Sequence, residues 1–256
     1  MTLLFSSLLA GPSPGVQQTR TLVVADDTLA AAQSLVRPVV LDFASARNPG
    51  GGYAAGVAGQ EEDLCRQTDL AQFLESAEAR PFYEHHQTLG PLNSSWCLYV
   101  PVVRVRATST EVAVIACAAP NAREARTYGY SDAQIAQTMR DRVQQVLRVA
   151  ARQQHTHLVL GAWGCGHFGN DPEVVADAFA QELEAMPGAF DEVVFAIHGP
   201  AWMRASFERR FGGWDGWVSE TSGGVGSAGG SETRRRRCVR ARRSGPRRRS
   251  EPRTAP

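Results

Sequence analysis

Two adjacent glutamates, Glu61 and Glu62, are the side chains of this sequence best suited to acid–base chemistry. They follow Gln60, and seven intervening residues separate Gln60 from three consecutive glycines, Gly50 to Gly52. Two carboxylates held close together do not ionise easily at the same time, so such a pair keeps a proton near neutral pH and can act as a general acid. The alternative interpretation is structural, with the two glutamates as the acidic first turn of a helix that continues to Ala71.

The three glycines belong to a loop that follows an expected strand. The segment 38–44 is rich in apolar and β-branched residues, and it leads through Asn48 into Gly50, Gly51 and Gly52. Because glycine has no Cβ, such a loop can bring its backbone N–H groups against ribose or phosphate oxygens. A flexible turn is the alternative interpretation of a glycine run taken by itself.

A second glycine-rich loop follows another expected strand and leads into a helix. It starts at Gly161, and it ends at Asp171 and Pro172, which suit the N-cap and the first position of that helix. Backbone N–H groups at the positive end of a helix hold a diphosphate without a cation. Two such loops at strand ends predict a cleft of nucleotide size. Neither loop has the spacing of a dinucleotide-binding or Walker motif, and the sequence contains no lysine.

The elements that must position these loops alternate between strand and helix, which is typical of an α/β domain. Several expected strands are apolar at successive positions, so helices should cover both faces of the sheet in a three-layer sandwich. The strands are expected at 21–25, 38–44, 98–107, 112–119, 157–163 and 192–198, and the clearest helices at 132–154, 172–186 and 201–210.

Composition divides the chain into three parts. Residues 1–20 are expected to form a loose N-terminal arm, 21–217 the folded domain, and 218–256 a disordered tail with almost no apolar residues. The tail holds 11 of the 27 basic and 3 of the 26 acidic residues, which gives it a net charge of +8 and the rest −7. Such a tail can contact polyanions nonspecifically.

The cysteines give no sign of a disulfide framework or a metal site. Their number is odd and their spacing is not that of paired metal ligands: Cys65, Cys97, Cys117, Cys165 and Cys238. Cys165 lies in the second glycine loop, but no His and Asp partners for a nucleophile can be assigned to it. No stretch is apolar enough to span a membrane. We therefore expect a cytoplasmic monomer that needs no metal or other cofactor.

The two loops and the glutamate pair, taken in order, resemble the motifs of bacterial-type poly(ADP-ribose) glycohydrolases, which belong to the macrodomain superfamily. The likeness rests on the spacing from Gly50 to Glu62 and on the loop from Gly161 to Pro172, which is similar to that family's diphosphate loop. It extends from about Thr21 to Phe211. The resemblance implies a macrodomain-like α/β/α sandwich with a central mixed sheet, and an enzyme that hydrolyses the ribose–ribose bond and releases ADP-ribose.

The same resemblance implies roles for individual residues. Glu62 would be the catalytic acid, Glu61 would bind the hydroxyls of the terminal ribose, and Phe168 would pack against that ribose. Phe195 to His198 would lie near the adenine. The implied substrate-binding residues are Asn48, Gly50, Gly51, Gly52, Gln60, Gly164, Cys165, Gly166, His167, Phe168 and Gly169. Through an oxocarbenium-like state, Glu62 would protonate the leaving oxygen and then activate a water.

Two other functions share the expected fold and cleft. A non-catalytic reader of ADP-ribose would bind the same ligand but would not need an acid at Glu62. A hydrolase for mono-ADP-ribose on protein side chains would differ only in its leaving group. The expected partners are therefore poly(ADP-ribose) or ADP-ribosylated proteins.

Overall fold

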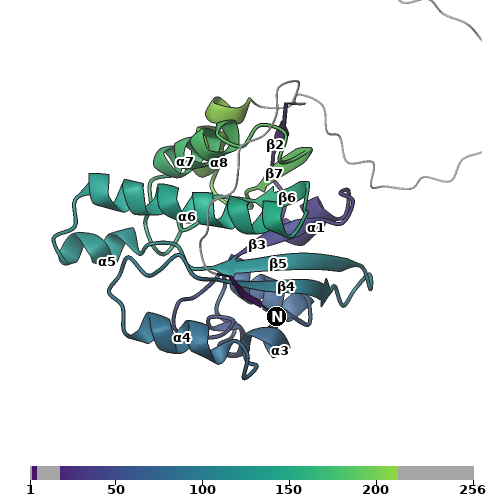
Figure 1. Cartoon of the computed structure of the whole chain (residues 1–256), viewed down its shortest axis with the longest axis horizontal. Helices are drawn as coiled ribbons and strands as arrows, with labels where there is room; N and C mark the ends of the chain where they lie inside the picture. The colour runs from purple at the N-terminus through teal and green to yellow at the C-terminus, as the bar shows by residue number, and fades with distance from the viewer. Residues whose placement is uncertain (1, 5–17, 213–256) are drawn as a thin grey trace, which may run out of the picture. The chain divides into compact units, whose positions relative to one another are not determined.

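The computed structural model describes residues 2–4 and 18–212, in which a central sheet lies between two layers of helices (Figure 1). The expected tail at 218–256 and most of the expected N-terminal arm lie outside the described residues. Within the described part, the sheet has seven strands in the order β1-β4-β5-β3-β6-β7-β2. The strands are β1 Thr2–Leu4, β2 Arg20–Val24, β3 Val39–Phe43, β4 Cys97–Arg104, β5 Glu111–Cys117, β6 His157–Leu160 and β7 Glu192–Ala196.

The helices follow the strands in alternation through most of the described chain. They are α1 Thr28–Ala32, α2 Gln60–Gln67, α3 Leu70–Leu74, α4 Arg80–Gln87, α5 Ala122–Thr127, α6 Asp132–Arg152, α7 Pro172–Glu184 and α8 Ala201–Phe211, with a 3-10 turn at Tyr53–Ala55. No helix of this part is long and apolar enough to cross a membrane.

The sheet is mixed, as expected. β5, β3, β6, β7 and β2 pair in parallel, whereas β4 is antiparallel to β5 and β1 is antiparallel to β4. The carboxyl ends of β3, β5, β6 and β7 therefore meet at one edge of the sheet. In parallel α/β sheets this edge is where ligands bind.

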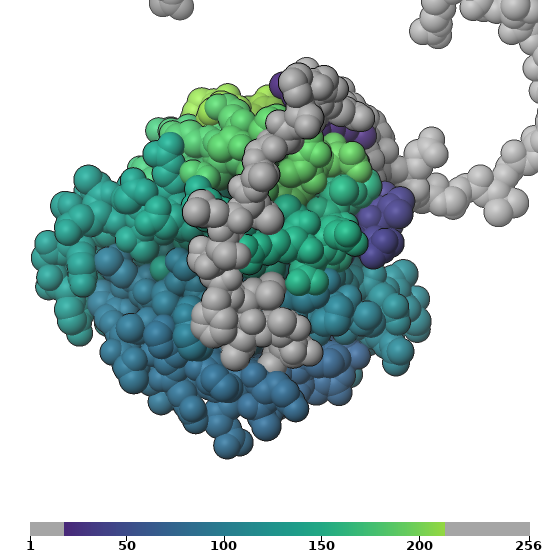
Figure 2. All heavy atoms as spheres, viewed as in Figure 1, coloured from purple at the N-terminus to yellow at the C-terminus, as the bar shows by residue number. Residues whose placement is uncertain are grey.

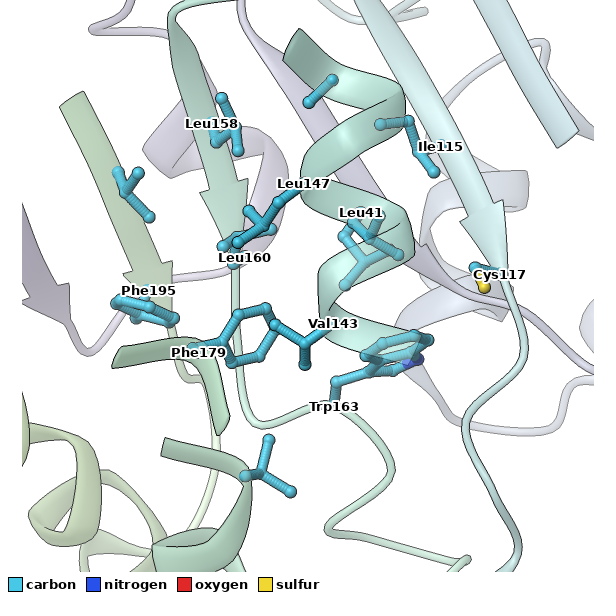
Figure 3. Packing of buried hydrophobic residues seen from close by; sticks show 14 of the residues in the cluster. Leu41, Ile115, Cys117, Val143, Leu147, Leu158, Leu160, Trp163, Phe179 and Phe195 are labelled. Atoms are coloured by element: carbon cyan, nitrogen blue, oxygen red, sulfur yellow. The ribbon is translucent and has the colours of Figure 1, made fainter. Parts of the chain in front are cut away.

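Alternate residues of β3 show why the fold has three layers. Val39 and Leu41 pack in the hydrophobic cluster that includes α6, α7 and α8, whereas Val40 packs in the cluster that includes α1 to α4. Figure 3 shows Val143 and Leu147 of α6 directed at the sheet around Leu41. Full burial of one such side chain stabilises the fold by about 1.5–3 kcal/mol. In the space-filling view, α3 and α4 lie on one side and α7 on the opposite side (Figure 2).

In the described part, capping side chains determine where α6 and α7 begin. Asp171 caps α7 by accepting a hydrogen bond from the N–H of Glu173 at 2.9 Å, and Pro172 occupies the first turn, both as predicted. Ser131 and Gln134 form a capping box at the start of α6. These caps fix where α7 begins after the second glycine loop and where α6 begins after α5.

All six predicted strands form, with ends that differ by no more than three residues, and the three predicted helices form as well. The prediction missed the short elements β1, α1, α4 and α5. Residues Thr2–Leu4 belong to the expected loose arm but pair with β4.

The helix expected to continue to Ala71 is a wrong prediction, because α2 ends at Gln67. Thr68 is extended, with φ −132° and ψ −179°. The Thr68 hydroxyl donates to the carbonyl of Leu64 and accepts from the N–H of Leu70. It therefore supplies hydrogen-bond partners to the C-terminal end of α2 and to the N-terminal end of α3.

Candidate active site

The two glycine loops lie side by side because the strands before them are neighbours. β3 pairs with β6, so the loop after Phe43 and the loop after Leu160 leave the same edge of the sheet. The turn after β5, which includes Asn121, lies on the other side of β3. Three segments far apart in the sequence therefore surround one site.

The glycines of the first loop enclose the carboxylate of Glu62. The N–H of Gly52 donates to Glu62 Oε1 at 3.1 Å. A Cβ on Gly51, which has φ +61°, would lie 2.3 Å from Glu62 Oε1, and a Cβ on Gly59 would lie 2.1 Å from Oε2. Only residues without a side chain allow the backbone to approach the carboxylate this closely. This geometry explains why glycines at this spacing accompany the glutamate.

Glu61 points into the protein, whereas Glu62 remains partly exposed. The Glu61 side chain is buried, and its Oε2 accepts a hydrogen bond from the N–H of Ser45 at 2.7 Å. Both glutamates also lie in the first turn of α2, where negative charge is favourable. The structural and catalytic interpretations of the pair are therefore compatible, and Glu62 is the more exposed of the two carboxyls.

Asp42, which was not among the predicted site residues, is a third carboxyl at this site. It lies on β3, is fully buried, and neither of its oxygens has a hydrogen-bond partner in the described residues. Burial, followed by the charge of Glu62, raises the pKa of Asp42 to about 8. Burial, followed by the charge of Asp42, also raises the pKa of Glu61. The pKa values of two buried carboxyls close to Glu62 are therefore raised.

The signal for Asp42 was present in the sequence. It is a charged residue inside a strand that is apolar on both faces, between Leu41 and Phe43. A buried carboxyl without a partner costs free energy, so its presence indicates a functional site.

The side chain of Gln60 is hydrogen-bonded within the protein. Its Nε2 donates to the carbonyl of Leu41 at 2.8 Å and to Thr28 Oγ1 at 3.1 Å, and its Oε1 accepts from the N–H of Phe43 at 2.8 Å. Gln60 therefore fixes α2 against the end of β3, and its expected contact with the substrate stays a prediction.

The second loop is held in shape by Asn170, which also was not among the predicted site residues. Its Nδ2 donates to the carbonyl of Pro120 at 2.8 Å and to that of Gly164 at 3.0 Å. Gly164 has φ +71°, and Gly169 has φ +65°. Gly166 is exposed, and a Cβ there would meet no atom within 4 Å. The loop thus presents open backbone at Gly166.

Cys165 lies in this loop, but its side chain points away from solvent. The thiol is buried, and burial raises its pKa. A thiol that stays protonated and buried is a poor nucleophile. Of the expected contacts of Cys165, only those of its backbone are compatible with this geometry.

Asn48 and Phe168, one from each loop, line a single cavity of about 170 Å³. The carbonyl of Phe168 accepts a hydrogen bond from the N–H of Arg123 at 2.9 Å, which fixes the loop against α5. His167 is exposed beside Phe168, with 6.1 Å between the ring centroids. The structure therefore brings together two of the residues that the resemblance implies for substrate binding.

Phe195 is not part of the cleft. Its ring is fully buried among α7 and α8, stacked on Phe211 at 4.3 Å between ring centroids. Its expected place near the adenine is therefore wrong, because β7 is apolar on both faces and Phe195 belongs to the core. His198, two residues beyond the end of β7, is exposed.

Comparisons with known proteins agree with this architecture. Residues 5–107 match the family model for the microbial-type PARG catalytic domain. Poly(ADP-ribose) glycohydrolase from Deinococcus radiodurans, solved in complex with ADP-ribose, is 38% identical, with a TM-score of 0.70 over 77% of this chain and 85% of that chain. The enzyme from Thermomonospora curvata is 39% identical, with a TM-score of 0.72 over 79% and 80% of the two chains. Among curated proteins, no sequence matches the chain.

The fold defines a macrodomain-like α/β protein whose candidate ligand site is built from glycine loops at the carboxyl ends of parallel strands. At 38–39% identity over most of the relatives' length, the chain belongs to the microbial-type poly(ADP-ribose) glycohydrolase family. It is therefore a hydrolase of the glycosidase class.

Proposed function

We propose that this protein hydrolyses the ribose–ribose bond of poly(ADP-ribose) and releases ADP-ribose, with Glu62 as the general acid and base. The observation that carries this proposal is the position of Glu62, a partly exposed carboxyl enclosed by Gly51, Gly52 and Gly59. The relatives solved with ADP-ribose or with the inhibitor ADP-HPD support a ligand of this class.

The two glycine loops supply the binding groups in this proposal. Exposed backbone around Gly166 contacts the diphosphate, and Asn48 and Phe168 contact the ribose whose bond is cut. Glu61, with its raised pKa, is a neutral carboxyl and can donate or accept a hydrogen bond at that ribose. The groups proposed to bind the substrate are therefore backbone dipoles and neutral side chains.

Bond cleavage then uses one proton of Glu62. As the bond between the anomeric carbon and the leaving oxygen breaks, the oxygen keeps the electron pair and takes the proton from Glu62. The resulting carboxylate accepts a proton from a water, whose oxygen attacks the oxocarbenium-like carbon. Glu62 ends the cycle protonated.

Incubation of the purified protein with poly(ADP-ribose) tests this function by the appearance of free ADP-ribose. A parallel incubation with mono-ADP-ribosylated protein separates the two hydrolase activities. Release from the polymer supports the proposal. Release only from the modified protein would overturn the chosen substrate, and binding of ADP-ribose without release from either would identify a reader.

We further propose that the protein acts as a monomer in a reducing cytoplasm. The four cysteines in the described residues are buried free thiols, which suits such a compartment. The Arg-rich segment at 218–256 would attract polyanions, including the polymer itself, through its net charge.

A further inference from the structure

Arg142 is a buried cation that takes no part in the proposed reaction. It lies on α6 with 2% of its surface exposed, and it forms no ion pair with any residue that the structure describes. A buried charge without a partner of opposite charge costs free energy, and an apolar side chain of similar volume would avoid that cost. Packing alone therefore does not explain an arginine at this position.

The guanidinium of Arg142 links two backbone segments that lie far apart in the sequence. Its Nη1 donates to the carbonyl of Ala118, which directly follows β5, and its Nη2 donates to the carbonyl of Leu92 at 2.9 Å. The planar fork of arginine can hold two acceptors in a fixed geometry, whereas the ammonium of lysine is a single point charge. Arg142 therefore ties the loop 88–96, between α4 and β4, to the turn 118–121 after β5.

Both segments form walls of the cavity of about 170 Å³ at the candidate active site. Pro91 and Asn93 come from the loop, and Asn121 comes from the turn. The two walls also contact each other, since the N–H of Asn121 donates to the carbonyl of Pro91 at 2.8 Å. Nδ2 of Asn93 donates to the carbonyl of Ala119, also at 2.8 Å. Arg142 is not itself a lining residue, so it can act on a ligand only through these segments.

The turn 118–121 packs against the second glycine loop as well. The carbonyl of Pro120 accepts from Nδ2 of Asn170 at 2.8 Å, and a Cβ on Gly164 would lie 2.8 Å from the Cβ of Ala119. Three successive carbonyls of the turn thus each accept a hydrogen bond from a different part of the chain: α6 at Ala118, the loop 88–96 at Ala119, and the second glycine loop at Pro120. A shift of the turn would therefore shift the loop that is proposed to hold the diphosphate.

We propose that Arg142 is a positioning residue of the hydrolase, which sets the spacing of the loop 88–96, the turn 118–121 and the second glycine loop, and hence the fit of the ADP-ribose unit. The inference rests on the proposed function for its ligand, because these segments surround the groups proposed to bind that unit. A change at Arg142 should thus weaken binding and catalysis without removing any group that touches the ligand.

Arg142→Lys and Arg142→Met test this role. Lysine keeps the charge but lacks the fork that reaches both carbonyls, and methionine is an unbranched side chain without a donor. Both variants should lower kcat/KM on poly(ADP-ribose) by about tenfold to a hundredfold, the size of the effect expected when binding groups are slightly misplaced. Affinity for free ADP-ribose, measured by calorimetry, should fall with it, and Arg142→Lys should be the milder variant.

Leu147→Ala is the control for a general loss of stability. Leu147 is fully buried on the same helix and packs in the core instead of on the loops. Its truncation should lower the melting temperature because it leaves a cavity. Well below that temperature, kcat/KM and ADP-ribose affinity should stay within about twofold of wild type, since no segment of the site is released.

Added guanidinium distinguishes a lost contact from a damaged fold. Arg142→Ala leaves room for the free ion, which can donate to the carbonyls of Ala118 and Leu92 in place of the side chain. At a concentration too low to unfold wild type, guanidinium chloride should raise the activity of Arg142→Ala by about tenfold. The same concentration of sodium chloride should not, and guanidinium should not raise the activity of wild type or Leu147→Ala.

The outcomes separate this inference from the proposed function. If wild type releases no ADP-ribose from the polymer, the proposed function fails, and the calorimetry alone then decides the role of Arg142. If Arg142→Lys and Arg142→Met both keep the wild-type affinity and kcat/KM, the positioning role is wrong. Losses no larger than those of Leu147→Ala, or a folded Arg142→Ala that guanidinium does not restore, would also overturn it.

Discussion

At the scale of single residues, the site contains carboxyl groups whose burial costs free energy of folding. In the described residues, neither carboxyl oxygen of Asp42 has a hydrogen-bond partner, and Oε1 of Glu61 has none either. Buried carboxyls of this kind reduce stability when they ionise. Their position next to Glu62 indicates a role in the chemistry of the site rather than in stability.

The first prediction concerns Asp42 and pH. In the unfolded chain this carboxyl ionises near pH 3.8, whereas in the folded protein it keeps its proton up to about pH 8. The folded state therefore binds more protons across this window, so the stabilising contribution of Asp42 is complete below about pH 4 and is lost as pH rises towards 8. Asp42→Asn cannot ionise and should become more stable relative to wild type, by on the order of 3 kcal/mol between pH 5 and 8. Urea unfolding at several pH values checks this, and parallel pH curves for the two proteins would contradict it.

The second prediction concerns Gly51, whose missing Cβ makes room for Glu62. Gly51→Ala should nearly abolish activity, because its methyl group would displace the carboxylate that lies 2.3 Å away. Gly56→Ala is the matched control, since Gly56 has a similar positive φ of +76° and no atom within 4 Å of its Cβ position. Both variants should lose about 1–3 kcal/mol of stability from backbone strain, but only Gly51→Ala should lose turnover. Equal activity in the two variants would show that the contact with Glu62 is unimportant.

At the scale of elements, the strands and the long helices could be predicted from the sequence, because hydrophobic periodicity and capping residues determine them. Strands and long amphipathic helices bury continuous apolar faces, as Val143 and Leu147 of α6 do, and this signal is local. The loops and Glu62 were also located from residue type and spacing. Short elements such as α4 and α5 were missed because tertiary packing decides them. Asn170 was missed, and the structural role of Gln60 was not predicted, because a carboxamide can bind protein or ligand equally well and only the fold shows its partners.

The third prediction concerns the second loop as a unit. Gly166→Val should weaken ADP-ribose binding by at least tenfold, because the side chain would fill the open space where the diphosphate is proposed to bind. Positive φ plays no part at this position, since the left-handed residues of the loop are Gly164 and Gly169. The unfolding free energy should therefore stay close to that of wild type. Gly90→Val, at another open glycine, is the control for calorimetry, and unchanged affinity in Gly166→Val would remove the loop from the site.

At the scale of the whole molecule, charge is unevenly distributed along the chain. Residues 218–256 carry a net charge of +8, and the remainder carries −7. The binding groups proposed for the cleft are mostly neutral, so long-range attraction of a polyanion has to come from elsewhere in the chain.

The fourth prediction concerns this charged segment. Deleting 218–256 should leave hydrolysis of short oligomers unchanged but weaken capture of long poly(ADP-ribose) at low salt, because fewer counterions are released on binding. The difference should vanish as ionic strength rises. Binding assays with long polymer at several salt concentrations check this. Equal capture by the full-length and shortened proteins at low salt would exclude the segment from recruitment.

The central claim is that Glu62 transfers the proton, and Glu62→Gln tests it most directly. The amide keeps the shape of the side chain but cannot donate the proton, so single-turnover release of ADP-ribose from the polymer should fall at least a hundredfold, while affinity for ADP-ribose stays within about twofold of wild type. Asp63→Asn, the next residue of α2, removes the same charge at an exposed position and should keep full activity. Turnover by Glu62→Gln above about a tenth of the wild-type rate would contradict the account.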